Sequence, residues 1–470
     1  MLFRGLLSCQ NRGTAARRTH FGKRPARGEA HVIFGIGRRG DVDDDDEDDE
    51  DEVELVLFQG ALNEKDPNLK ENAKLLQAGL VRAKELVSDA LSRRAEMIRL
   101  EPKGNAAVAS FFVDGIPVPG QRMPANAALA VTQVLKLMAG LDIKVRSKPQ
   151  SGGMNAEYNE VKYLIRVDTQ ILPAGGERLI VRAQNKAHRL ETPDDLGFSD
   201  DLKAKIRELT ARKKGLILAA GPPMSGVTTT AFAILRGIDG YIYTIYSLTD
   251  MTGREVMHIR RFEGNEDDDL PQTIGRAKRA EGDILYVDPL RDADFARLIL
   301  SECNDVCIVS EMAARDASDA IARLVQLVGD PQLVAANLTA VFSQKLVRLI
   351  CPSCRQAYRP HPKLLAKVGL PPETKVLYRA TEVDPDELED DEEPCAKCGG
   401  VGYVGRTAMI ECIEATDGMR SVIESGGDAA AIKAQARKEK MQSLQSDGVR
   451  LVATGKTSLE ELQRVFQSGK

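Results

Sequence analysis

The sequence has no tryptophan, and only 4% of its 470 residues are aromatic. Since 43% of the residues are hydrophobic, the cores should be built from aliphatic side chains. The longest apolar runs have the length of a strand, short of the roughly 20 residues that a membrane helix needs. The Arg-rich N-terminus lacks the apolar stretch of about 7–15 residues typical of a secretory signal. We therefore interpret it as a disordered tail rather than as an organelle transit peptide.

No charge of one sign dominates, because the net charge is −5, which argues against a general nucleic-acid binder. The charges are nevertheless unevenly spread. Residues 1–40 carry several arginines and almost no acid, whereas residues 41–54 are nearly all Asp and Glu. Such blocks predict disorder over residues 1–55. We place the boundary of this basic-then-acidic tail at residue 71.

Residues 72–200 predict an α+β domain. Apolar residues recur at three- and four-residue spacing from Asn72 to Leu91, as in an amphipathic helix. A turn is predicted at Asp114-Gly115. Strands are predicted at Met97–Glu101, Ala107–Val113, Val161–Val167 and Glu177–Val181, with a helix over Ala125–Ala139.

Residues 201–415 predict an α/β nucleotide-binding core, because apolar strands alternate with helices there. A second acidic run, at residues 381–393, is expected to form a loop, and residues 416–470 are expected to be helical, with breakers at Gly426-Gly427, Gly448 and Gly455. The predicted strands of the core are Gly215–Ala220, Tyr241–Tyr246, Ile284–Asp288 and Val306–Ser310.

A phosphate-binding loop is indicated at residues 221–228, which read Gly-Pro-Pro-Met-Ser-Gly-Val-Thr and lie between a predicted strand and a predicted helix. The pattern G-x-x-x-x-G-K-[ST] uses glycines to wrap backbone N–H groups around phosphates, a lysine as the cation and a hydroxyl to hold Mg²⁺. Here Val227 replaces the lysine, so the cation is missing. The alternative is a loop that keeps its glycines only for backbone geometry. The candidate nucleotide-binding residues of the loop are Gly221, Ser225, Gly226, Val227, Thr228 and Thr229.

Two Cys-x-x-Cys pairs, Cys351 with Cys354 and Cys395 with Cys398, predict a zinc element over residues 351–398. Four thiolates suit tetrahedral Zn²⁺, and four protein ligands leave no open position for water, so the site would be structural. The alternative is two reduced pairs without metal. Three further thiols are expected to be buried apolar residues instead, namely Cys303, Cys307 and Cys412.

The α+β domain, the phosphate loop and the cysteine pairs follow one another along the chain in this order. With them, roughly residues 83–470 resemble the secretion ATPases of type II secretion and type IV pilus assembly. The resemblance rests on Leu100-Glu101-Pro102, Asp114-Gly115, the loop, and Gln344–Arg348 running into Cys351. It implies a PAS-like N-terminal domain, a RecA-like ATPase domain and a homo- or hetero-hexameric ring. It also implies a cytoplasmic location at the inner membrane, where ATP hydrolysis acts through a platform protein.

Measured against that family, the catalytic motifs have lost their charged groups. Besides Val227, the acidic Glu-Asp-Pro box matches Tyr246-Ser247-Leu248, Pro289 stands in place of the glutamate that polarises water, and Ala313 replaces a histidine. Asp288 fits the general Walker B pattern and could hold Mg²⁺. Two arginines match residues that reach a nucleotide in the family, although salt bridges within the domain are the alternative; they are Arg166 and Arg182.

These losses make a catalytically inactive homologue, a pseudo-ATPase ring or platform-binding subunit, our main hypothesis, because phosphoryl transfer depends on positioned charge. Three alternatives stay open. The chain could bind nucleotide without turnover, it could be an active motor with a divergent site that uses Asp288, or it could be a soluble zinc-binding scaffold. The sequence therefore leaves the use of ATP and Mg²⁺ undecided.

Overall fold

The computed structural model describes residues 54–467 with short gaps. The gaps are residues 174, 188–191, 250, 252–255, 266 and 384–392. Residues 1–53 of the predicted tail, which include nearly all of its acidic run, and most of the second acidic run therefore lie outside the described residues. None of the helices in the described part is long and apolar enough to cross a membrane.

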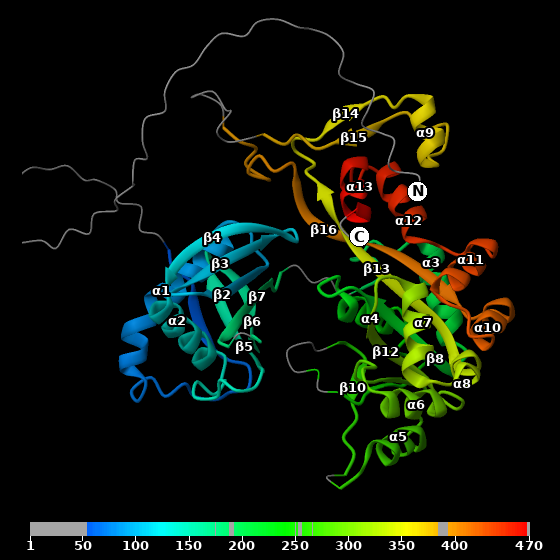
Figure 1. The fold of residues 1–470 in the computed structure, drawn as a ribbon, viewed down its shortest axis with the longest axis horizontal. Coiled ribbons are helices and arrows are strands. Elements are labelled where there is room, and N and C mark those ends of the chain that lie inside the picture. The colour runs from blue at the N-terminus through cyan, green and yellow to red at the C-terminus, as the bar shows by residue number, and fades with distance from the viewer. Residues whose placement is uncertain are drawn as a thin grey trace, which may run out of the picture. The chain divides into compact units, whose positions relative to one another are not determined.

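The first folded domain is a seven-stranded antiparallel sheet with two helices packed against it (Figure 1). Its strands lie in the order β1-β5-β6-β7-β2-β3-β4. The buried apolar residues of α1 and α2, spaced at three and four residues, share one core with the sheet. Its elements are β1 (Leu57–Ala61), α1 (Ala73–Ser92), β2 (Met97–Lys103), β3 (Ala106–Val113), β4 (Ile116–Pro124), α2 (Ala125–Met138), β5 (Gln150–Tyr158), β6 (Val161–Ile171) and β7 (Glu177–Asn185).

Three strands of this sheet were missed in the sequence. The strand β1 falls inside the predicted tail, so the expectation of disorder up to residue 71 is wrong for residues 57–61, which pair with β5. The strand β4 contains Pro117 and Pro119, which argue against a strand, but β4 is the edge of the sheet, where proline is tolerated. The strand β5 contains Gly152, where a Cβ would lie 2.6 Å from the Ala139 carbonyl oxygen.

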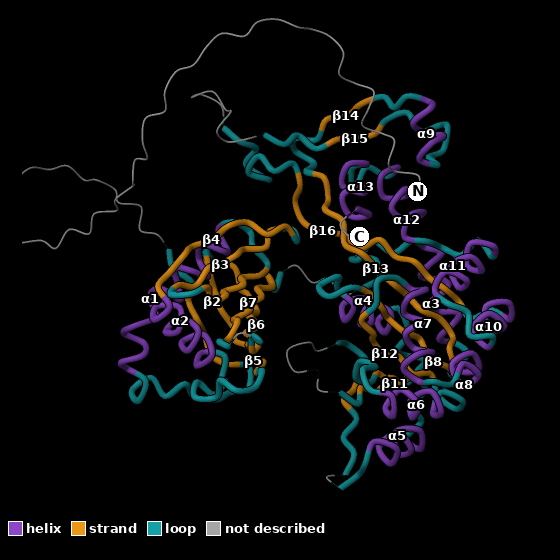
Figure 2. Tube along the Cα trace, viewed as in Figure 1, coloured by secondary structure: helices purple, strands orange, loops and turns teal. Residues whose placement is uncertain are grey.

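The second domain is a mostly parallel sheet in the order β10-β9-β11-β12-β8-β13-β16, in which β13 and β16 are antiparallel. Figure 2 shows strands of this domain flanked by helices. This confirms the predicted α/β core. Its elements are α3 (Asp200–Thr210), β8 (Gly215–Gly221), α4 (Val227–Arg236), β9 (Ile245–Ser247), β10 (Ile259–Arg261), α5 (Leu270–Arg279), β11 (Ile284–Tyr286), α6 (Ala293–Glu302), β12 (Cys307–Ala313), α7 (Ala317–Val328), α8 (Pro331–Asn337), β13 (Leu338–Ile350) and β16 (Tyr403–Glu414).

The central strand β8 is buried on both faces, so its sequence is a continuous apolar run rather than an alternating one. Leu216 and Leu218 face a core that contains residues of α6 and α7. Ile217 and Ala219 face the opposite core, which contains residues of α3 and α4. The strand is therefore fixed from both sides at the point where it enters the phosphate loop.

The chain between β13 and β16 forms a small insertion, and the C-terminus is helical as predicted. Gly448 does not break a helix, however, since it lies inside α12, where a Cβ would come within 2.6 Å of Leu462 and 2.7 Å of the Met409 sulfur. This glycine allows close packing instead. The elements are β14 (Gln356–Tyr358), α9 (Pro362–Val368), β15 (Leu377–Arg379), α10 (Asp417–Glu424), α11 (Ala429–Lys438), α12 (Leu444–Ala453) and α13 (Leu459–Gln467).

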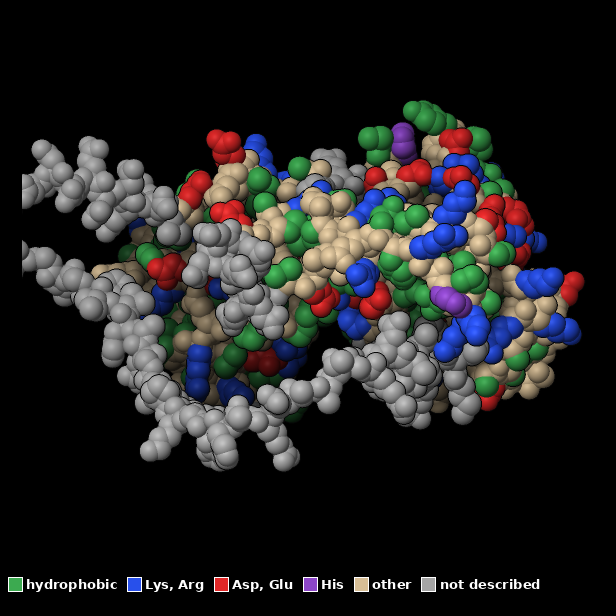
Figure 3. Space-filling view, turned by 90° about the horizontal axis from the view of Figure 1, so that it is seen from above, with side chains coloured by type: hydrophobic (Ala, Val, Ile, Leu, Met, Phe, Trp, Pro, Cys, Tyr) green, Lys and Arg blue, Asp and Glu red, His purple; other side chains and the backbone are tan. Residues whose placement is uncertain are grey.

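The surface carries charges of both signs. On the face drawn in Figure 3, the Lys and Arg side chains are interspersed with Asp and Glu side chains over the described residues. No charge of one sign covers the described part of that face.

Candidate functional site

The predicted strand, loop and helix are present at residues 215–236, where β8 runs into the loop and α4 begins at Val227. Gly226 precedes the helix with φ of 83°, a left-handed conformation that favours glycine. At Gly221, a Cβ would lie 2.4 Å from Ser225 Oγ. The backbone path therefore favours glycine at 226, and Gly221 leaves room for the Ser225 hydroxyl, whether or not a phosphate is bound.

The loop borders a cavity of about 1230 Å³, which is ample for a nucleotide-sized ligand. Residues from the first domain lie on its wall together with the loop, β12 and α7. Two of the predicted site residues, Ser225 and Asp288, are described by the structure but do not line the cavity. The predicted site residues that do are Gly221, Gly226, Val227, Thr228, Thr229, Arg166 and Arg182.

Arg166 and Arg182 are directly paired across β6 and β7, so one side of the cavity carries two neighbouring guanidinium groups. Arg182 also forms an ion pair with Asp168 within the domain. The cavity wall is rich in arginine beyond this pair. Its other arginines are Arg291, Arg323 and Arg406.

Val227 places an apolar side chain on the cavity wall where the lysine of a phosphate loop belongs. Its backbone N–H is also used internally, since the fully buried Gln344 accepts it at 2.9 Å in the amide orientation that satisfies both ends of that side chain. The Gln344 amide then donates to the Ala220 carbonyl at 3.1 Å. The loop has therefore lost its cation and has one N–H fewer for a phosphate.

A buried carboxylate meets the loop at the residue that would hold Mg²⁺. Thr228 Oγ1 donates to Glu311 Oε2 at 2.8 Å, and the Tyr286 hydroxyl donates to Glu311 Oε1 at 2.5 Å. Glu311 is only 5% exposed and lines the cavity. Sequence reasoning missed this role because it ended the strand at Ser310. The strand β12 continues to Ala313 by pairing with β8, and an acid within such an apolar strand was the available signal.

Asp288, the predicted Mg²⁺ residue, is exposed and contributes its backbone instead, as its carbonyl accepts Ser310 Oγ at 2.8 Å. The two residues matched in the sequence to the family's catalytic groups, Pro289 and Ala313, do line the cavity. Neither can carry charge. Of the residues matched to the acidic box, Tyr246 of β9 donates to the Ala280 carbonyl at the end of α5, at 3.3 Å.

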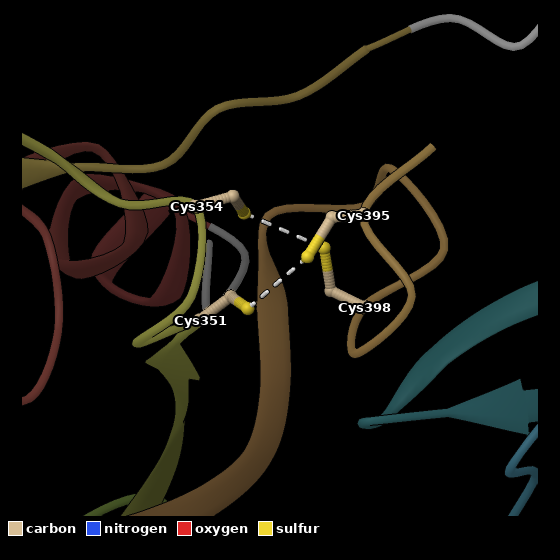
Figure 4. A group of neighbouring side chains, drawn as sticks. All are labelled: Cys351, Cys354, Cys395 and Cys398. Carbon is tan, nitrogen blue, oxygen red and sulfur yellow. Dashed lines mark hydrogen bonds between the residues drawn. The ribbon is translucent and has the colours of Figure 1, made fainter. Parts of the chain in front are cut away.

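The four predicted zinc ligands are brought together by the loop after β13 and the segment before β16, and their side chains point toward one another (Figure 4). All four sulfurs lie within 4.8 Å of one another, with Cys351 3.9 Å from Cys395 and Cys354 3.6 Å from Cys398. Tetrahedral zinc with Zn–S bonds of about 2.3 Å places sulfurs about 3.8 Å apart. The arrangement therefore fits zinc.

Local hydrogen bonding favours the thiolate form at Cys395, whereas burial and the neighbouring thiols raise the pKa of the Cys354 thiol. The backbone N–H of Cys398 lowers the pKa of the Cys395 thiol to about 7. The Gly402 N–H donates to the Cys398 sulfur at 3.3 Å. The other predicted thiols, Cys303, Cys307 and Cys412, are buried in the apolar cores, as expected.

A mostly parallel sheet in which an interior strand ends in a glycine-rich loop and a helix defines a P-loop type fold. The chain belongs to the family described as "Type II/IV secretion system protein", whose model matches residues 75–464. The family resemblance seen in the sequence is thereby confirmed.

Individual relatives agree with this assignment. The chain is 30% identical over 389 residues to "Type IV pilus assembly ATPase PilB" of Thermus thermophilus, covering 81% of this chain but 42% of that protein. It is 29% identical to "Type II secretion system protein E" of Pseudomonas aeruginosa, covering 81% of this chain and 74% of that protein. The chain thus spans less than half of the first relative.

The fold is also similar to a solved structure. The ATPase DotB of Legionella pneumophila superimposes with a TM-score of 0.50 at 14% identity, covering 83% of this chain and 96% of DotB. At this identity the likeness concerns the fold alone.

Proposed function

We propose that this chain is a non-catalytic member of the secretion and pilus assembly ATPases, a pseudo-ATPase that contributes its fold and surfaces rather than hydrolysis. One observation carries the proposal: Val227, Pro289 and Ala313, which replace a cation, a water-polarising acid and a histidine, line one cavity. Losing one such stabilising group commonly costs about 10²–10³ in rate. Losses within a site do not add simply, but three in one cavity remove the charge chemistry of phosphoryl transfer.

The partners follow from the family. In this proposal the chain joins a homo- or hetero-hexameric ring and binds an inner-membrane platform protein from the cytoplasmic side. The first domain has the PAS-like fold implied by the resemblance, and the four cysteines hold a structural zinc ion. The α+β domain is supported by its seven-stranded sheet, and the zinc by the sulfur distances.

Binding of a nucleotide without turnover is a second candidate, favoured by the arginines on the cavity wall. Arg166 and Arg182 line the cavity from the first domain, where Arg182 also pairs with Asp168. In this version the guanidinium groups, rather than the loop, would hold the phosphates.

Phosphate release by the full chain tests the proposal. With Mg²⁺ and ATP we expect a rate no higher than that of the matched variant Thr228→Ala, because the hydroxyl of Thr228 would matter only if the loop held Mg²⁺. A coupled phosphate assay under the same conditions measures both. Mg²⁺-dependent release that Thr228→Ala abolishes would show instead an active motor with a divergent site.

A further inference from the structure

The carboxylate of Glu311 lies beside the phosphate loop, where hydrogen bonds hold it in place. The side chain reaches from β12 to the first turn of α4, where Thr228 donates to one carboxylate oxygen, while Tyr286 of β11 donates to the other. Three neighbouring elements thus converge on one carboxylate that is 5% exposed. A buried charge is retained only where it is paired or hydrogen-bonded in this way.

The position of this carboxylate matters because the first turn of a helix after a glycine-rich loop is where phosphate groups bind. The partial positive charge of the helix N-terminus stabilises any anion there, including a side chain. The loop of a phosphate-binding protein offsets the charge of its ligand with a lysine, and Val227 offers none. A phosphate entering here would meet a fixed negative charge with no cation from the loop between them.

Tyr286 holds the carboxylate in this position from the other side. Its hydroxyl donates to Glu311, and its ring packs edge-on against Phe232 of α4, with centroids 5.3 Å apart. The Glu311 backbone is fixed as well, since its carbonyl accepts the Leu290 N–H at 2.8 Å. The carboxylate is therefore held by the packed core rather than by a mobile loop.

We infer that Glu311 is the residue that decides which ligands the phosphate loop accepts, and that its carboxylate excludes nucleotide phosphates by placing a negative charge beside the first turn of α4. The inference rests on the proposed non-catalytic function and gives it a mechanism. It adds that restoring the lysine alone does not restore phosphate binding. The introduced cation would pair with Glu311 instead.

Calorimetric titration with ADP tests this in four full-length proteins: the wild type, Val227→Lys, Glu311→Gln, and the double variant. We expect the double variant to bind ADP about tenfold or more tightly than Val227→Lys, because like charges brought together weaken binding strongly. Tyr286→Phe is the matched control, since it removes a hydrogen bond to Glu311 but keeps the charge, and it should gain no affinity. Circular dichroism confirms that each variant is folded, and Glu311→Thr replaces Glu311→Gln if the latter is not.

Two results would overturn the inference. Equal ADP affinity of Val227→Lys and the double variant would show that Glu311 does not exclude phosphates. Mg²⁺-dependent ADP binding by the wild type that Glu311→Gln removes would show that Glu311 holds the metal. The failure of the proposed function is separate, because it requires phosphate release by the wild type, which none of these titrations measures.

Discussion

Replacing Cys395 with serine is expected to remove the bound zinc and to unfold the insertion between β13 and β16. Within its described residues the insertion has three short elements, β14, α9 and β15, and their apolar contacts belong to a small core shared with α12 and α13. Structural zinc contributes about 10–16 kcal/mol in small zinc-folded domains. Loss of one thiolate leaves three ligands, too few for a closed tetrahedral site.

Zinc content by elemental analysis and limited proteolysis of the insertion measure the two effects. The matched control is Cys412→Ala, because Cys412 is a buried thiol outside the cluster, and it should keep both the zinc and the protease resistance. Wild-type protein that carries no zinc would refute the assignment of the cluster as a metal site. Zinc retained by Cys395→Ser would exclude Cys395 as a ligand.

A second large effect is expected at Lys136, a fully buried lysine on α2. Its Nζ donates to the Glu177 carboxylate at 2.9 Å and to the Val145 carbonyl at 2.7 Å, and the Glu177 side chain is only 6% exposed. Lys136→Met removes the cation and leaves a buried carboxylate unpaired. Breaking such a pair costs about 3–5 kcal/mol, so backbone amides of α2 and β7 should exchange their hydrogens several-hundred-fold faster.

Hydrogen exchange measured by mass spectrometry checks this, with two controls. The same substitution at Lys433, whose pair with Asp316 is exposed, should cost less than about 1 kcal/mol. The double variant Lys136→Met with Glu177→Gln should recover most of the protection, since no charge is then left buried. Normal protection in Lys136→Met alone would mean that the buried pair contributes little to the stability of the domain.

The parts of the fold that the sequence predicted are those with a local signal. The apolar run before Gly221, the glycine spacing of the loop and the alternation of strands with helices indicated the α/β core. Each of them follows from backbone geometry within a few residues. The four-cysteine cluster was also predictable from the sequence, because each Cys-x-x-Cys segment places two potential metal ligands close together.

The features that the sequence did not reveal depend on partners distant along the chain. Glu311 lies 83 residues from Thr228, and no pattern near Glu311 in the sequence indicates that its side chain reaches the first turn of α4. Nothing in the sequence indicated that Lys136 is buried, because its partner Glu177 lies on a different element of the domain. Asp288 shows the opposite case. Its local sequence matches the Walker B pattern well, but β11 ends at Tyr286 and Asp288 does not line the cavity.

Binding of ATP to the wild-type full-length chain tests most directly the claim that this chain keeps the fold of the secretion ATPases without their charge chemistry. We expect calorimetric titration with Mg²⁺ and ATP to show no saturable binding at ATP concentrations below about 1 mM. A Kd of about 1 mM corresponds to roughly 4 kcal/mol of binding free energy. The variant Thr228→Ala should give the same result as the wild type. Micromolar binding that Thr228→Ala weakens would contradict the account, because the loop would then hold Mg²⁺ and phosphate despite Val227 and Glu311.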